Sequence, residues 1–291
     1  MSSNVFAVLV TYNPIFPKLI ALLQSLRAAD VVCCVVDNSA GIDFSAVSGL
    51  CHLVLLGDNK GIATAQNIGI ETCLAQGAER IVFFDQDSVI SERLIAELVD
   101  AFKDPEVKIS APVFFNESQG FEYPLVDVRA CGTVRKRSVN SFSEAIDVST
   151  VISSGTMVDA SVFSIVGCMD ERLFIDYVDT EWCLRCMREG ISIRVNPRAS
   201  MLHSIGDQSL RFRFFVVPVH SPLRRYYRIR NSLLLLRLRH VPLLYSLREI
   251  ALNHFHQLVI LLFLRDRYQY LRYCALAIRD GIKGVSGRIH Q

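Results

Sequence analysis

Two carboxylates, Asp85 and Asp87, follow directly after the apolar segment Arg80–Phe84. At the end of a strand, side chains two residues apart both reach one divalent cation, or the ribose of a nucleotide beside it. Hard oxygen ligands of this kind suit Mg²⁺ or Mn²⁺. An isolated Asp-x-Asp also occurs in solvated turns, so the pattern gains meaning only from its surroundings.

Three further acids, Asp176, Asp179 and Glu181, occur within six residues at the start of the predicted helix Asp179–Glu189. A carboxylate held beside a substrate hydroxyl can act as a general base. Acidic residues in a first helical turn also stabilise the helix electrostatically. Both interpretations stay open on the residues alone.

Other catalytic motifs are missing from the sequence. It contains no G-x-x-x-x-G-K-S/T, no G-x-G-x-x-G and no G-x-S-x-G. This argues against a P-loop nucleotidase, a dinucleotide-dependent oxidoreductase and an α/β-hydrolase. The nine cysteines have no regular spacing, which argues against a disulfide scaffold and favours reduced thiols in a cytosol. Cys183 and Cys186 form a single CxxC pair within a predicted helix and are interpreted as packing residues.

The elements that must position these residues alternate between short apolar strands and helices. Strands are predicted at Val5–Val10, Val31–Val36, Leu53–Leu56, Arg80–Phe84 and Val107–Phe114. Helices are predicted at Phe16–Ala29, Ile62–Gln76 and Glu92–Phe102, the last with Ser91 as its N-cap. This alternation predicts an α/β fold with a parallel sheet covered on both faces. A chain of 291 residues that is 51% hydrophobic is long enough to bury a sizeable core.

Polar clusters follow four of the predicted strands. They are Thr11-Tyr12-Asn13, Asp37-Asn38-Ser39, Asp58-Asn59 and Asp85-Gln86-Asp87-Ser88. The carboxyl ends of parallel strands meet at one edge of a sheet, where open α/β sheets bind their ligands. We therefore expect the four clusters to converge on one crevice.

The C-terminal third differs in charge from the rest of the chain. Residues 1–197 contain 15 Lys and Arg against 25 Asp and Glu, whereas residues 198–291 contain 16 against 4. Helices are predicted at Leu223–Arg239, Leu243–Leu264 and Asp266–Lys283. No uncharged stretch reaches the roughly 20 residues needed to cross a bilayer. Basic helices rich in Leu, Phe and Tyr favour an anionic membrane surface over nucleic acid. The alternative is that they pack on the core or form a homo-oligomer contact.

Taken together, these segments resemble the inverting GT-A glycosyltransferases of family 2, and more narrowly the bacterial rhamnosyltransferases of O-antigen and related polysaccharides. The resemblance covers nearly the whole chain. The segments that carry it are 10–14 (VTYNP), 36–39 (VDNS), 59–69 (NKGIA through NIG), 84–88 (FDQDS), 154–156 (SGT), 176–185 (DYVDTEWCLR), 203–206 (HSIG) and 224–231 (RRYYRIRN).

The resemblance implies a role for each matching residue. It implies nucleotide-sugar contacts for Thr11, Tyr12, Asn13, Asp37, Asn59, Gly61, Asn67, Asp85 and Gln86. It implies metal ligation by Asp85, Asp87 and His203, and a general base at Asp179. Many relatives carry Glu-Asp where this chain has Val178-Asp179, so Glu181 competes for the role of base.

Contacts to the acceptor or to a phosphate are further expected for Glu181, Trp182, Arg185, Arg225 and Arg230. The arginines of 224–230 have two interpretations. They form a solvated helix face, or they reach the diphosphate of the donor or of a lipid-linked acceptor.

The sequence thus predicts a GT-A core over residues 1–205 and a helical region over residues 206–291. The resemblance implies an Mg²⁺- or Mn²⁺-dependent transfer of L-rhamnose from dTDP-β-L-rhamnose, with inversion, to a lipid-linked saccharide in lipopolysaccharide synthesis. The N-terminus has no signal-peptide pattern, so we expect a cytoplasmic enzyme on the inner face of the inner membrane. Two alternatives are another donor, such as a UDP-hexose, and a non-catalytic membrane-bound binding module on the same fold.

Overall fold

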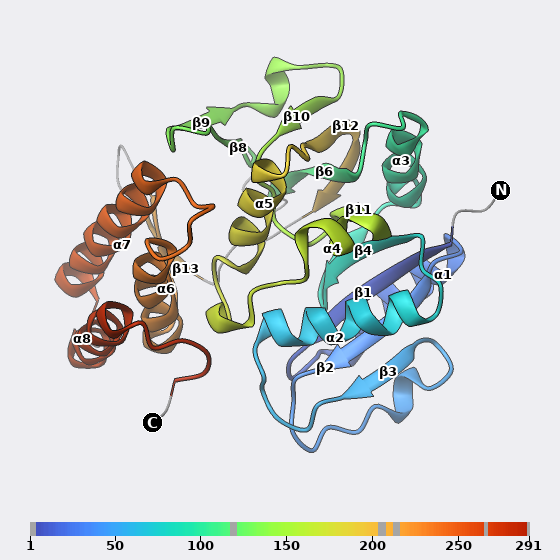
Figure 1. Cartoon of the computed structure of the whole chain (residues 1–291). Helices are drawn as coiled ribbons and strands as arrows, with labels where there is room; N and C mark the ends of the chain where they lie inside the picture. The colour runs from blue at the N-terminus through green and yellow to red at the C-terminus, as the bar shows by residue number, and fades with distance from the viewer. Residues whose placement is uncertain (1–3, 117–120, 203–207, 212–215, 265–266, 290–291) are drawn as a thin grey trace.

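A computed structural model describes residues 4–116, 121–202, 208–211, 216–264 and 267–289. Helices flank a central sheet in the larger part of the molecule, and three C-terminal helices stand beside it (Figure 1). The predicted boundary near residue 205 falls within residues 203–207, outside the described residues.

Four neighbouring strands on one side of the sheet are parallel. In spatial order they are β3 (His52–Leu55), β2 (Val32–Asp37), β1 (Val5–Thr11) and β4 (Arg80–Asp85). β1 and β2 are linked by α1 (Phe16–Ala28), and β3 and β4 by α2 (Ile62–Ala75). A parallel pair needs such a crossover, because the chain must return to the starting edge before it can run in the same direction. These elements agree with the predicted ones to within a few residues.

The other side of the sheet is mixed, which differs from the predicted all-parallel sheet. β11 (Met157–Asp159) lies antiparallel between β4 and β6 (Ile109–Asn116), and β12 (Ile193–Leu202) pairs parallel with β6. Three short antiparallel strands complete it: β5 (Val89–Ile90), β7 (Phe121–Glu122) and β10 (Ile146–Val148). A separate hairpin pairs β8 (Leu125–Val128) with β9 (Val134–Arg137). The α/β class is confirmed, and the antiparallel strands β5, β7, β10 and β11 come from segments that lie outside the predicted strands.

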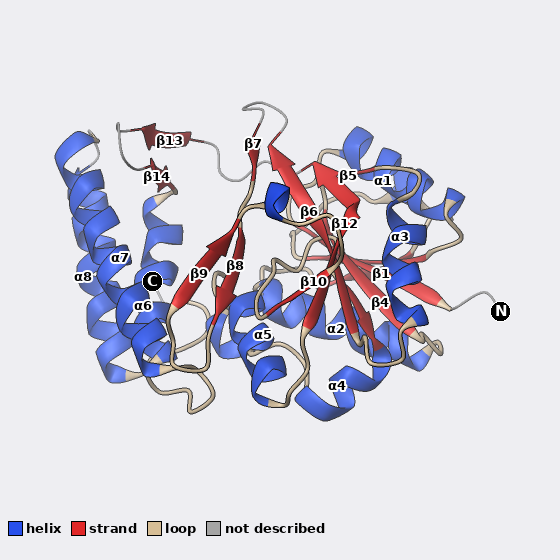
Figure 2. Cartoon of the chain, turned by 90° about the horizontal axis from the view of Figure 1, so that it is seen from above, coloured by secondary structure: helices blue, strands red, loops and turns tan. Residues whose placement is uncertain are grey.

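The sheet separates two apolar cores because residues alternate between its faces. Phe6 and Val8 of β1 point into the core beneath α2, α4 (Ala160–Val166) and α5 (Val178–Arg188). Val5, Ala7 and Leu9 point into the opposite core, beneath α1 and α3 (Leu94–Asp100). The two sets of helices lie on opposite sides of the sheet in Figure 2. α3 begins three residues after Ser91 and has Arg93 at its N-cap, so the predicted Ser91 cap is wrong.

The C-terminal region contains the hairpin β13–β14 and three helices packed against one another. Their bounds are β13 (Gln208–Arg211), β14 (Val216–Val219), α6 (Pro222–Leu235), α7 (Leu243–Phe263) and α8 (Arg267–Lys283). α6 ends four residues before the predicted Arg239, and the chain turns there into α7. Among the described residues no helix combines the length and the hydropathy required to cross a bilayer.

Candidate active site

The ends of β1 and β2 form a buried polar pair. Thr11 Oγ1 donates to Asp37 Oδ1 at 2.7 Å, and both side chains are buried. Asp37 also accepts from the backbone N–H of Ser39 at 2.9 Å and from its hydroxyl at 2.8 Å. Because three donors converge on one carboxylate, its oxygens are held in a single orientation at the rim of the sheet. This is the convergence that the sequence predicted for the first two clusters.

The fourth cluster meets the first across the crevice. Gln86 Oε1 accepts from the backbone N–H of Tyr12 at 2.8 Å, and Gln86 Nε2 donates to the Tyr12 carbonyl at 3.2 Å. Asn13 has a positive φ of 47°, and its N–H donates to Ser39 Oγ at 2.7 Å. Gln86 therefore fixes the β1 loop by contacts to its backbone, while the Tyr12 side chain stays exposed.

The third cluster is held by Asn38 and Asn59. Asn38 Oδ1 accepts from the Lys60 N–H, and Asn59 Oδ1 accepts from the Gly61 N–H, both at 3.0 Å. Gly61 has a φ of 89°, and a Cβ there would lie 2.6 Å from the Phe174 ring. Only glycine fits this close approach, which lets the Ile62 N–H donate to the Phe174 carbonyl at 2.8 Å.

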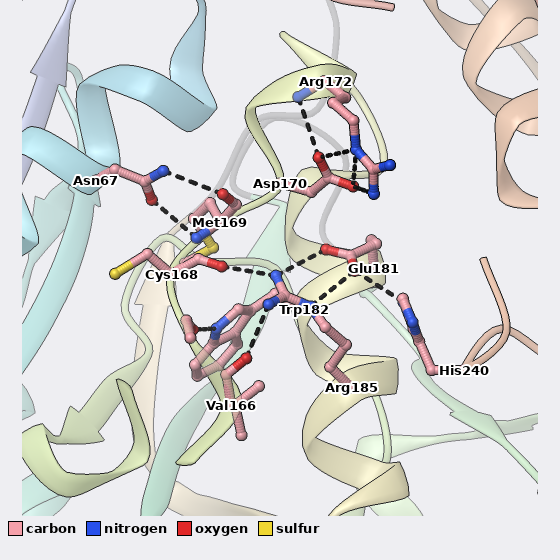
Figure 3. Close-up of polar contacts among 11 residues, drawn as sticks. Asn67, Val166, Cys168, Met169, Asp170, Arg172, Glu181, Trp182, Arg185 and His240 are labelled. Atoms are coloured by element: carbon pink, nitrogen blue, oxygen red, sulfur yellow. Dashed lines mark hydrogen bonds and ion pairs between the residues drawn. The ribbon is translucent and has the colours of Figure 1, made fainter. Parts of the chain in front are cut away.

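Asn67 joins α2 to the loop that precedes α5. Its amide exchanges two hydrogen bonds with the Met169 backbone, at 2.8 and 3.0 Å (Figure 3). It also donates to Glu171 Oε1 at 2.8 Å. The side chain is buried, and these contacts position the loop before α5.

Asp85 and Asp87 lie at the end of β4 in a turn, with Asp85 half-buried and Asp87 exposed. Ser154 Oγ accepts from the Asp85 N–H at 3.2 Å and lies 3.1 Å from the Ser88 hydroxyl, which holds the turn in place. Two hard carboxylates at an open strand end fit an Mg²⁺ or Mn²⁺ ion. The expected third ligand, His203, lies outside the described residues. Within the described part of the chain, no three His, Cys, Asp or Glu residues are grouped closely enough to hold a metal.

Asp179 lies in the first turn of α5 and lines a small cavity together with Phe83 of β4 and Ser153. Burial raises the pKa of its carboxyl, and repulsion from Asp176 and Asp85 adds to the rise, while the Thr180 N–H, donating at 2.8 Å, opposes it. Asp176 and Asp85 thus add negative charge around the Asp179 carboxyl. A carboxylate with a raised pKa next to a charged group is suited to accepting a proton.

The loop that delivers Asp179 has an unusual backbone. Phe174, Asp176 and Tyr177 have φ values of 65°, 63° and 67°, in the left-handed region that disfavours side chains. Such conformations persist only where their surroundings over-determine them, and they concentrate at functional sites.

Asn231 of α6 provides that restraint, and sequence reasoning gave it no role. Its side-chain amide donates to the carbonyls of Leu173 and Ile175 at 2.8 Å and of Asp176 at 3.0 Å. Arg230 adds a 3.1 Å bond to the Leu173 carbonyl. Asn231 belongs to the last segment of the resemblance, 224–231, and that membership is the only signal in the sequence that pointed to it.

Arg230 and Arg225 donate to acceptors within the protein, and their expected contact with a phosphate stays a prediction. Arg230 is fully buried and also donates to the Gly287 carbonyl at 2.5 Å. Arg225 is 1% exposed and donates to Gln257 Oε1 at 3.1 Å and to the Asn253 carbonyl at 2.6 Å. A buried guanidinium must be satisfied by protein acceptors, so neither residue lies on a solvated helix face.

Glu181 is also buried and paired with residues inside the protein. Its Oε1 lies 2.7 Å from both Arg185 Nε and His240 Nε2, and it is 1% exposed (Figure 3). Arg185 also donates hydrogen bonds to the carbonyls of Val166 and Cys168, at 2.9 and 2.7 Å. Glu181 is buried and already paired with Arg185 and His240, whereas Asp179 lines a small cavity, so this geometry favours Asp179 over Glu181 for contact with a substrate hydroxyl.

Trp182 also belongs to this internal network. It is buried and donates from Nε1 to the Gly167 carbonyl at 2.9 Å (Figure 3). Glu181, Trp182 and Arg185 therefore hold α5 against α4 and the following loop. The expectation that these three residues contact the acceptor or a phosphate stays a prediction.

A pocket of about 530 Å³ opens between the strand ends and the C-terminal region. Tyr12 and Asn59 line it from the sheet side, and Phe174, Tyr227, Arg288 and Ile289 line it from the opposite side. The first and third clusters and the loop before α5 thus line one pocket, and Gln86 of the fourth cluster bonds to the backbone of its lining residue Tyr12.

Comparison with known proteins agrees with this geometry. Residues 6–166 match the sequence profile described as Glycosyl transferase family 2. The chain is 45% identical over 290 residues to the dTDP-rhamnosyl transferase RfbF of Shigella flexneri, covering 99% of this chain and 98% of that protein.

Solved structures show the same fold at low sequence identity. S. aureus TarS 1-349 in complex with UDP-GlcNAc aligns with a TM-score of 0.58 and 13% identity over 97% of this chain and 81% of that one. GalNAc-T7 with UDP, GalNAc and Mn²⁺ aligns with a TM-score of 0.56 and 12% identity over 95% of this chain and 57% of that one. The expected GT-A fold is confirmed, and the profile match together with the near full-length identity shows that this chain belongs to glycosyltransferase family 2.

Proposed function

We propose that this enzyme transfers L-rhamnose from dTDP-β-L-rhamnose to a hydroxyl of a lipid-linked saccharide, with inversion at the anomeric carbon. The proposal for the donor rests on the 45% identity to a dTDP-rhamnosyl transferase over nearly the whole chain. The chemistry is supported by Asp179 in the first turn of α5, which lines a small cavity with Phe83 of β4 and whose pKa is raised by burial and by repulsion from Asp176 and Asp85.

The reaction is a single displacement. The acceptor hydroxyl oxygen forms a bond to C1 of the sugar while the bond from C1 to the diphosphate oxygen breaks. The hydroxyl proton passes to the Asp179 carboxylate, and dTDP leaves with the bonding electrons. One base on the face opposite the leaving group is enough, so the site needs no second flanking carboxylate.

The strand-end clusters would bind the donor. Thr11 and Asp37 would hold the nucleoside, with Asp37 accepting from the N3–H of the base, and Tyr12, Asn13, Asn59 and Gly61 would shape the surrounding loops. Asp85, Asp87 and His203 would hold an Mg²⁺ or Mn²⁺ ion. When bound, this ion stabilises the charge that develops on the leaving diphosphate. Gln86 would keep the Tyr12 loop closed beside it, through the contacts at 2.8 and 3.2 Å.

A donor screen tests this proposal. The purified chain is incubated with Mn²⁺, a lipid-linked saccharide and, in parallel, dTDP-β-L-rhamnose, dTDP-glucose, UDP-glucose or UDP-GlcNAc, and release of the nucleoside diphosphate is measured. We expect release from dTDP-β-L-rhamnose, and loss of that release when EDTA removes the metal. Faster release of the nucleoside diphosphate from a UDP-sugar would overturn the assignment of the donor. No release from any of the four donors would favour a non-catalytic binding module.

Membrane contact is part of the same proposal, because a polyprenyl-linked acceptor stays in the bilayer. The support is an exposed apolar stripe on one face of α7, with residues three or four positions apart: Leu244, Leu247, Ala251, Phe255, Leu258 and Leu262. Spacing of this kind places the side chains along one side of a helix. Exposed arginines on the adjacent α8, Arg267 and Arg272, supply positive charge near this stripe. Such a surface suits the cytoplasmic face of an anionic inner membrane.

A further inference from the structure

The pocket between the strand ends and the C-terminal region has one charged lining residue among those described, Arg288. Its other lining residues are neutral, including Tyr12 from the β1 loop and Asn59 from the β3 loop. Tyr12 is bonded through its backbone to Gln86, between the two carboxylates of the β4 end. The pocket therefore borders both the nucleoside clusters and the segment 85–87.

The backbone around Arg288 is held in place. The Gly287 N–H donates to the Arg172 carbonyl at 2.6 Å, and the Gly287 carbonyl accepts from Arg230 at 2.5 Å. On the other side, the Ile289 N–H donates to the Tyr227 hydroxyl at 3.1 Å, and Ile289 packs into the apolar cluster around that ring. Because the backbone is held at both Gly287 and Ile289, the Arg288 side chain is directed to the pocket before a ligand binds.

The Arg288 guanidinium keeps donors available for an anion. Its two contacts, to Asp58 Oδ1 and Oδ2 at 2.8 and 2.7 Å, both use Nη1. Guanidinium has five N–H donors, so those on Nε and Nη2 are not used in this pair. Both side chains are about half exposed, and exposed pairs of this kind contribute little stability. Arg288 can therefore bind a phosphate in place of the Asp58 carboxylate, or in addition to it, with little loss of stability.

We propose that Arg288 is a donor-binding residue whose guanidinium group contacts the diphosphate of the nucleotide. This inference rests on the proposed function and adds to it a residue from the far C-terminal end of the chain. A nucleoside diphosphate carries two to three negative charges, and the planar fork of arginine matches two phosphate oxygens at once. The C-terminal segment then serves catalysis directly, because it completes the donor pocket that the strand ends begin.

Ligands that differ only in phosphate content test the assignment. Calorimetry with thymidine, dTMP and dTDP, with and without Mn²⁺, is run on the wild-type chain and on Arg288→Ala, Arg288→Lys, Asp58→Asn and Arg27→Ala. Arg27, in the last turn of α1, is an exposed arginine that does not line the pocket, and it serves as the matched control. We expect Arg288→Ala to weaken dTDP binding about tenfold or more, the scale of a lost charge-assisted contact, and to change thymidine binding less than about twofold. Arg288→Lys should recover part of the loss.

Asp58→Asn separates binding from anchoring. A diphosphate contact predicts unchanged or tighter dTDP binding in this variant, because the guanidinium is released from its carboxylate. If Asp58→Asn instead loses as much affinity as Arg288→Ala, and thymidine binding falls in parallel, Arg288 is only an anchor and the proposal is wrong. Equal dTDP affinity of wild type and Arg288→Ala would also overturn it. A wild-type chain that binds neither dTDP nor UDP would overturn the proposed function itself, an outcome that is distinct from the others.

Discussion

Replacing Asn231 by alanine tests whether the left-handed loop before α5 is held from outside. The change removes one amide that donates to three backbone carbonyls at 2.8–3.0 Å and accepts from Arg230 Nε and Nη2 at 2.9 and 2.8 Å. The two amide hydrogens contribute about 1 kcal/mol each, and the bonds from a charged partner about 1.5–3 kcal/mol. Because the site is fully buried, water does not replace them. We expect the free energy of unfolding to fall by about 3–5 kcal/mol.

The same change is expected to reduce turnover. Asp179 follows Tyr177 by two residues, so relaxation of the loop displaces the base from the acceptor hydroxyl. Displacements of about 1 Å cost catalysis up to roughly a hundredfold, and we expect kcat to fall tenfold or more while the KM for the donor changes little. The measurements are thermal or urea unfolding and steady-state release of dTDP.

Ser232→Ala is the matched control for this experiment. Ser232 is the next residue of α6, is equally buried, and donates to the Ile229 carbonyl within the same helix at 2.8 Å. It should cost about 1 kcal/mol or less and leave kcat unchanged. If Asn231→Ala keeps wild-type stability and turnover, or behaves like Ser232→Ala, the loop is not held by this contact and the reasoning is refuted.

Two further predictions concern the base and the membrane surface. Asp179→Asn should bind dTDP normally and transfer at least ~100-fold more slowly, whereas Glu181→Gln should act mainly on stability, and the reverse pattern would show that the base is misassigned. Because burial raises the pKa of Asp179, kcat of the wild type should rise with pH over a range above the pKa of an ordinary aspartate. If Asp179→Asn shows the same rise in its pH profile of kcat, the rise does not come from Asp179. On α7, the double change Leu258→Ser and Leu262→Ser should weaken flotation with anionic liposomes and leave activity on a soluble acceptor intact. If the wild type floats with neither anionic nor neutral liposomes, the stripe has no lipid role.

The sequence by itself was enough to predict strands β1 to β4, helices α1 and α2, and the sheet edge at which the polar clusters of these strands meet. Apolar runs of 4–6 residues that alternate with helices of about 12 are local patterns, and they specify strand or helix without knowledge of the rest of the chain. Parallel strands then bring their carboxyl ends to one edge, which is why Thr11, Asp37 and Asp85 were expected together. The Thr11–Asp37 contact at 2.7 Å confirms that Thr11 and Asp37 meet at this edge.

Only the tertiary structure decided which charged side chains remain available for chemistry. Glu181 and Asp179 look alike in the sequence, yet Glu181 is neutralised by Arg185 and lies beside His240, which is 59 positions further along the chain. Arg225 and Arg230 look like a solvated basic face, yet both are buried among acceptors from α7 and from the chain end. Whether an ionisable group is exposed, paired or desolvated depends on partners that folding brings together, and local pattern does not encode those partners. The same dependence on distant residues placed the antiparallel β11 inside the sheet and brought Arg288 to the pocket that Tyr12 and Asn59 line.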